Sequence, residues 1–131
     1  MDNAAVLSAL RSRLLASPKI TDLVGQKVYV SRADVAGQTP AVALEIAGGE
    51  GRLNRKHHRV DVRVNIWSAV SWAQAFEIQD NVSNELDFTP SDRFPEFPEP
   101  LLTVTASAPI QMPQGDYYHL VQTFTVTAKE A

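Results

Sequence analysis

The three histidines of this sequence are the side chains best suited to metal binding or acid–base chemistry. His57 and His58 are adjacent, and neighbouring residues on extended backbone point to opposite faces, so this pair is poorly placed to hold one metal ion. His119 falls among threonines on the side of a predicted strand that is turned away from the core, where we expect a surface histidine. We therefore predict no histidine-based metal site and no catalytic histidine.

Other reactive groups are equally unpromising. The sequence has no cysteine, which excludes disulfides, thiolate metal sites and a cysteine nucleophile. The glycines at 48, 49 and 51 do not form a phosphate-binding loop, because no lysine followed by serine or threonine stands at the required spacing. Nothing in the sequence buries the carboxylates between Asp80 and Glu99 or forces two of them together, so we expect a solvated acidic face. We predict that the protein is not an enzyme and uses no cofactor or metal.

Charge is distributed unevenly along the chain. The segment 48–59 collects four cations, Arg52, Arg55, Lys56 and Arg59. They could contact nucleic-acid phosphates, but no aromatic residues for base stacking lie between them, so a solvated loop or a protein contact is favoured. Residues 80–99 form an acidic flank, in which Arg93 is the one cation. Its acidic residues are Asp80, Glu85, Asp87, Asp92, Glu96 and Glu99. Opposite charges at two places on one subunit suit a head-to-tail contact, which can close into a ring.

A second candidate contact element is the proline-rich arm 88–100. It contains prolines at positions 90, 95, 98 and 100, and both regular helix and strand are disfavoured there. Phe94 and Phe97 give the arm apolar groups that either pack on a neighbouring subunit or cover the chain's own core. Our candidate contacts with other subunits or with a partner protein are Arg52, Arg55, Lys56, Arg59, Phe94 and Phe97.

Composition sets the frame for these segments. The chain has 131 residues, of which 44% are hydrophobic and 21% charged, with a net charge of -3. These values are typical of one globular domain over 1–131 with an ordinary core, and they exclude a global basic field that would bind nucleic acid nonspecifically. We find no secretory signal and no apolar run near the roughly 20 residues that cross a bilayer. We expect folding in the cytoplasm and no membrane partner.

The clearest structural pattern lies between 58 and 86. Val60, Val62, Val64 and Ile66 alternate with polar residues, which predicts a long half-buried strand. Ser71 then stands three residues before Gln74, the spacing of a capping box, and opens an amphipathic helix that should end near 86 or 87. The helix must fold back over the apolar face of the strand.

The remaining segments predict two further helical elements and the other strands of one sheet. We predict a helix from residue 2 or 3 that ends before Pro18, a helical turn at 21–24, a short edge strand at 27–30 and a strand at 41–47. Segment 48–59 is expected to be an exposed, mobile hairpin loop, and 109–115 a long turn between strands at 101–108 and 118–127. Gln122 is the single polar residue on the apolar face of the last strand. The predicted fold class is α+β, with one mostly antiparallel sheet, or a mixed one, and helices on one face.

Three sequence segments resemble the tail-completion family of tailed bacteriophages. They are the opening Ala-Leu-Arg-Ser-Arg-Leu-Leu-Ala-Ser-Pro at 9–18, the Ile-Thr-Asp-Leu-Val-Gly at 20–25 before Val28 and Tyr29, and the Val-x-Val-x-Ile-Trp-Ser strand at 62–68 before a helix. The similarity extends over nearly the whole chain. It implies a small α+β protein without catalytic residues that acts as a tail terminator or head-to-tail joining protein in a six-fold ring.

The same resemblance implies the partners and location. The protein would be a structural virion protein at the head-proximal end of the tail, assembled in the host cytoplasm. Its partners would be further copies of itself in a hexameric ring, the tail tube protein and the head connector or stopper protein, with incidental contact to DNA in the lumen. Two alternatives stay open: another neck or tail component, such as a connector-binding or tube-like subunit, or a small-ligand or nucleic-acid binding domain using the strand face with Arg63, Asn65 and Trp67.

Overall fold

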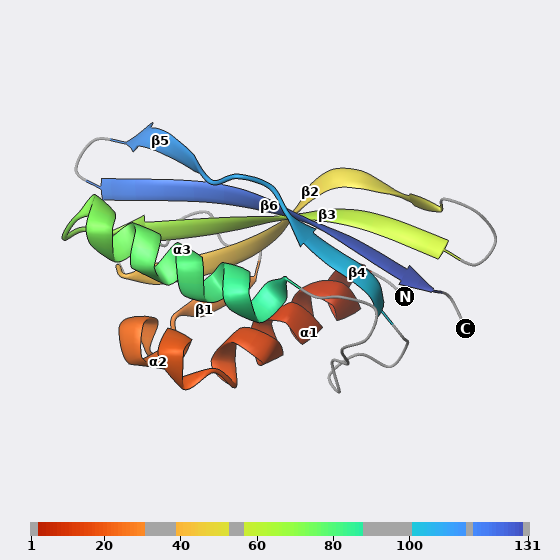
Figure 1. The fold of residues 1–131 in the computed structure, drawn as a ribbon, viewed down its shortest axis with the longest axis horizontal. Helices are drawn as coiled ribbons and strands as arrows, with labels where there is room; N and C mark the ends of the chain where they lie inside the picture. Colours follow the sequence, from red (N-terminus) through yellow and green to blue (C-terminus); the bar gives the residue numbers. More distant parts are fainter. Residues whose placement is uncertain (1–2, 31–38, 53–56, 88–100, 115–116, 130–131) are drawn as a thin grey trace.

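The fold is a single six-stranded sheet with helices on one side (Figure 1). The computed structural model describes residues 3–30, 39–52, 57–87, 101–114 and 117–129. Its helices and strands are α1 Asn3–Leu15, α2 Pro18–Val24, β1 Val28–Val30, β2 Ala41–Arg52, β3 His57–Ser68, α3 Trp72–Leu86, β4 Leu101–Ala106, β5 Ile110–Gln114 and β6 Tyr117–Lys129.

The strand order is β1-β2-β3-β6-β4, and β5 also pairs with β6. β1 runs parallel to β2, whereas the other strand pairs are antiparallel. The predicted α+β class is thus confirmed, in its mixed-sheet form. β1 lies at an edge of the sheet, as its short length predicted.

The core lies between the sheet and the helices. β3 turns Val60, Val62, Val64 and Ile66 toward it, each at most 1% exposed. α3 meets them with side chains at helical spacing, which are Ala75, Ile78, Val82 and Leu86, all 0% exposed. α1 adds Val6, Leu10 and Leu14 to the same cluster. Removing such side chains from water is the main driving force that holds the helices against the sheet.

The junction between β3 and α3 is fixed by two serines. Ser71 caps α3, because its hydroxyl accepts a hydrogen bond from the Gln74 backbone N–H at 3.1 Å. The Ser68 hydroxyl donates to the Gln74 side-chain oxygen and accepts from the backbone N–H of Val70 at 3.1 Å. The predicted helix start is confirmed, although the Gln74 side chain bonds Ser68 instead of reaching back to the cap. These hydrogen bonds therefore fix the direction in which α3 leaves the end of β3.

Segment 48–59 is mostly strand, so the expectation of a hairpin loop across it was wrong. β2 continues to Arg52 and β3 starts at His57, which leaves 53–56 between them, outside the described residues. The pairing shifts between Ile46 and Gly48 and again between Gly48 and Gly51. Glycines commonly occupy such bulges. These glycines therefore interrupt the register without ending the strand.

The expected long turn at 109–115 was also wrong, because it contains β5. β4 and β5 pair with successive parts of β6 and together make one edge strand. Proline is tolerated on such an edge, which explains why Pro113 does not prevent pairing. Between the Ala106–Phe124 pair and the Ile110–Val121 pair, the edge strand advances four residues and β6 three. One extra residue is therefore accommodated near Ser107.

Candidate assembly surface

The outer face is the side of the sheet that is turned away from the helices. Pairing register places its side chains in rows that cross the strands. One row is Ala41, Trp67, His119 and Met112, the next is Tyr29, Ala43, Asn65, Val121 and Ile110, and the third is Glu45, Arg63 and Thr123. The first two rows are largely apolar, and the third begins a polar region. The outer face thus has two chemically different ends.

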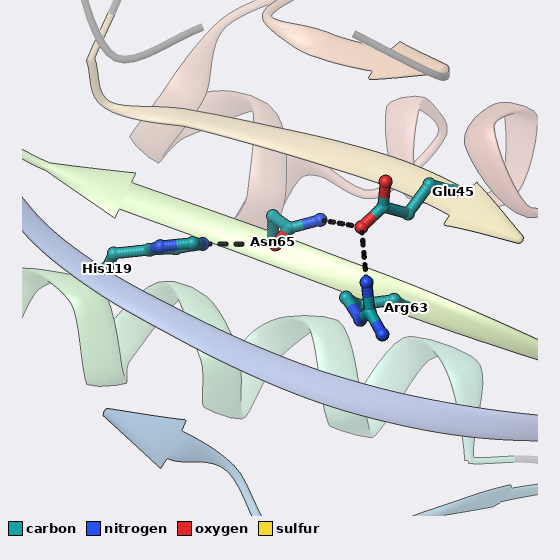
Figure 2. Close-up of polar contacts among 4 residues, drawn as sticks. All are labelled: Glu45, Arg63, Asn65 and His119. Carbon is teal, nitrogen blue, oxygen red and sulfur yellow. Dashed lines mark hydrogen bonds and ion pairs between the residues drawn. The ribbon is translucent and has the colours of Figure 1, made fainter. Parts of the chain in front are cut away.

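A polar network joins three strands on this face (Figure 2). Both Arg63 Nη1 and Asn65 Nδ2 donate to Glu45 Oε1, at 3.1 and 3.2 Å. His119 Nε2 lies 3.0 Å from Asn65 Oδ1. Because the Asn65 amide nitrogen is used on Glu45, its oxygen is left to accept, and the neutral His119 ring carries its proton on Nε2. The network fixes the positions of β2, β3 and β6 relative to one another.

His119 is a buried residue, so the expectation of a surface histidine was wrong. It is 9% exposed and stacks on Trp67, with ring centroids 4.4 Å apart. Burial lowers its pKa below the ordinary value of 6.5, and the nearby Glu45 carboxylate opposes that effect. The sequence placed His119 on the correct face. It could not show that the register sets a tryptophan directly beside it.

The apolar end of the outer face has a buried centre and an exposed margin. Ala41, Ala43 and Trp67 form a small buried cluster against which Tyr29 and Tyr117 pack. The margin is β5, where Ile110 is 60% and Met112 40% exposed. Val70, which follows β3 at the same end, is 68% exposed. Among the residues that the structure describes, these three are the large hydrophobic side chains most open to solvent.

The structure describes few of the candidate contacts predicted from sequence. Arg52 ends β2, where its backbone pairs with that of His58. Arg59 is exposed and lies 3.5 Å from the Asp61 carboxylate. Arg55, Lys56, Phe94 and Phe97 lie outside the described residues. On the acidic flank, Glu85 forms an ion pair with Arg13 at 3.5 Å. The structure therefore does not test these residues as contacts.

The described part of the chain offers little that resembles a catalytic centre. An open groove of about 340 Å³ between α2 and α3 is lined by Lys19, Asp22, Leu23, Glu77 and Asn81. Within residues 3–30, 39–52, 57–87, 101–114 and 117–129, no group of three His, Asp or Glu side chains could hold a metal ion. In these same ranges no helix is long and apolar enough to span a membrane. The features that stand out chemically are those of the outer face.

Comparison with known proteins shows a likeness of fold. No family model matches the sequence, and no curated protein matches it. A solved structure described as "Virion of native gene transfer agent (GTA) particle" contains a chain with a TM-score of 0.75 to this one. The alignment covers 97% of this chain and 96% of that chain, with 17% sequence identity. At this identity the likeness shows a shared fold, complete from end to end.

Proposed function

We propose that this chain is a structural, non-enzymatic virion protein that acts as a phage tail terminator. Copies of it form a hexameric ring on the head-proximal end of the tail tube and present a surface to the head connector or stopper protein. One face of the ring matches the last layer of the tube, and the other offers no copy of that layer. No further tube subunit can then be added.

The observation that carries this proposal is the fold shared with a chain of a gene transfer agent virion over 97% of the present chain. A complete match in both directions favours a protein of the same kind, although fold alone does not determine function. The sequence resemblance to tail-completion proteins, carried by residues 9–18, 20–25 and 62–68, points the same way. A virion location, assembly in the host cytoplasm and incidental contact with DNA in the lumen follow from this proposal.

Two alternatives differ in what they require. Another neck or tail component, such as a tube-like or connector-binding subunit, has the same virion context. A ligand or nucleic-acid binding domain would need free side chains on the outer strand face. There Arg63 and Asn65 are already bonded to Glu45, and Trp67 is 5% exposed. The binding-domain alternative is therefore the weaker one.

The test is assembly in the presence and absence of tube protein. We expect light scattering after size-exclusion chromatography, with negative-stain microscopy, to detect rings either in solution or at one end of the tubes. Purified protein added to polymerising tube should shorten or cap the tubes. Incorporation along the tube would instead identify a tube-like subunit. A protein that stays monomeric under both conditions contradicts ring formation.

A further inference from the structure

The exposed apolar side chains on β5 are the product of a local irregularity. Val104, Ile110 and Met112 all have even numbers, and on a regular strand they would share one face. Val104 points into the core and is 0% exposed. The extra residue near Ser107 reverses the alternation, so that Ile110 and Met112 pair beside Val121 and His119 on the outer face. Without this bulge both would face the helices.

The bulge is held by buried polar groups. Gln122, 3% exposed, donates from Nε2 to the Ser107 carbonyl oxygen at 2.8 Å. Its Oε1 accepts from Gln79 Nε2 of α3 at 3.1 Å. Ser107 also bonds Thr123, through its backbone N–H at 2.9 Å and its hydroxyl at 3.2 Å. Bulges that redirect side chains are commonly functional features of a sheet. An apolar margin exposed in this way is typical of a protein contact surface.

The chain's own Phe97 cannot reach Met112. The arm starts after Asp87, at the end of α3, and returns at Leu101, the first residue of β4 (Figure 1). Leu101 pairs with Ala128 and Met112 with His119, nine residues apart on β6, which is about 30 Å along a strand. Phe97 is four residues from Leu101, so it reaches at most about 14 Å from that anchor. A Phe97 that touches Met112 must come from another copy.

We infer that the outer side of β5, at Ile110 and Met112, is the docking surface for the proline-rich arm of a second copy of this chain, with Phe94 and Phe97 supplying the apolar groups. This inference rests on the proposed ring, because it names the contact between its subunits. Proline-rich segments dock well on apolar and aromatic surfaces, since little conformational entropy is lost. On the same face, Tyr117 of β6 pairs with Gln114 of β5 and packs against the cluster that contains Trp67.

The placement explains how such a contact propagates. The arm is anchored at the end of the sheet where β4 begins, and the docking surface lies at the opposite end of β6. Each copy therefore contacts one neighbour through its arm and the other neighbour through its β5 surface. Contacts of this heterologous kind close into rings when the rotation between subunits allows.

Engineered cysteines test the contact directly, because the natural chain has none. In the double variant F97C/M112C every subunit carries both cysteines, so each subunit can form one disulfide through its arm and another through its β5. Under mild oxidation with tube protein present, we expect a ladder of covalent oligomers on a nonreducing gel. The single variants F97C and M112C should give dimers at most. The matched control is F97C/Q111C, since Gln111 is exposed on the same strand but on the opposite face.

Each other outcome has a distinct meaning. A ladder from F97C/Q111C as strong as that from F97C/M112C overturns the assignment of the face. A fast-migrating, internally linked monomer overturns the contact between copies. Cross-linking of M112C to a tube protein that carries a cysteine assigns the surface to the tube instead. Rings seen by microscopy without any ladder overturn this inference and leave the proposed function standing, whereas absence of rings with and without tube removes both.

Discussion

His119 is held as a neutral ring by the groups that surround it. It stacks on Trp67, and its Nε2 proton is used on Asn65. Of the charged groups in its network, Glu45 favours the imidazolium, but desolvation is the larger effect and lowers the pKa below 6.5. Neutral His119 is therefore a structural part of the outer face.

Stability should fall with acid because of this residue. Below a pH of about 6.5 the unfolded chain protonates His119 while the folded protein resists it, so the unfolded state binds more protons and unfolding becomes easier. We expect urea unfolding between pH 8 and pH 5 to show a steeper loss of unfolding free energy for the natural protein than for H119Q. His57 and His58 are present in both proteins, so their effects cancel. Equal slopes for the two proteins would contradict a buried, neutral His119.

Gln122 is the side chain that connects the sheet both to α3 and to the bulge at Ser107. Its side chain bonds both Gln79 of α3 and the Ser107 carbonyl. In Q122L both partners lose a hydrogen bond, and the one with Gln79 is buried, so the change should cost about 1–3 kcal/mol of unfolding free energy. The double variant Q79L/Q122L should cost less than the sum of the two single changes, because one substitution removes the group that the other leaves unpaired.

Urea unfolding measures both quantities. The control is Q111L, a glutamine on β5 that is exposed, and it should change stability by less than about 0.5 kcal/mol. If Q122L is as mild as Q111L, the buried link between α3 and the bulge does not contribute to stability.

At the scale of elements, the start of α3 is the most sharply defined feature. S71A removes the cap hydrogen bond to the Gln74 backbone and should cost about 1 kcal/mol. S8A changes an exposed serine inside α1, where alanine is the better helix former, and should be neutral or slightly stabilising. Chemical denaturation of the two variants makes the comparison. Similar values for both would mean that Ser71 does not act as a cap.

Elements with a strong local pattern were predictable from sequence. The alternation on β3 and the capping serine before α3 led to both elements, and the apolar residues of that strand are the core of the structure. The α+β class follows, because a one-faced strand and an amphipathic helix must share their apolar sides. These inferences need no knowledge of which strands pair.

Features that depend on pairing were not predictable. Gly48 and Gly51 read as chain breakers, yet they sit at register shifts that β3 tolerates. Pro109 and Pro113 suggested a turn, although an edge strand accommodates proline without loss of a ladder bond. The outward turn of Ile110 and the stacking of His119 on Trp67 both follow from register. No local pattern carries that information.

At the scale of the whole molecule, substitutions in the basic segment 48–59 distinguish a role in assembly from a role in nucleic-acid binding. If the chain is a terminator, the variant R52Q/R55Q/K56Q should perturb ring or tube contacts. Any mobility shift of linear DNA by the natural protein should be weak and disappear at moderate salt. If the chain is instead a nucleic-acid binding domain, the natural protein should shift DNA and the triple variant should abolish that shift. Mobility assays and light scattering on the same two proteins distinguish the two functions.

The opposite charges of the chain fit a subunit that meets its neighbours through different surfaces. The acidic flank and the basic segment belong to different elements, and the net charge is only -3. Electrostatic complementarity of this type sets orientation and encounter rate more than affinity. The apolar margin on β5 would supply the affinity, since exposed apolar area is what such a contact can remove from water.

The most direct measurement is the length distribution of tail tubes polymerised with and without this protein, read from negative-stain images. We expect tubes that stop growing once the protein is added, each with a ring at one end. Tubes that continue to lengthen, with the protein either absent from them or spread along their walls, would contradict a terminator.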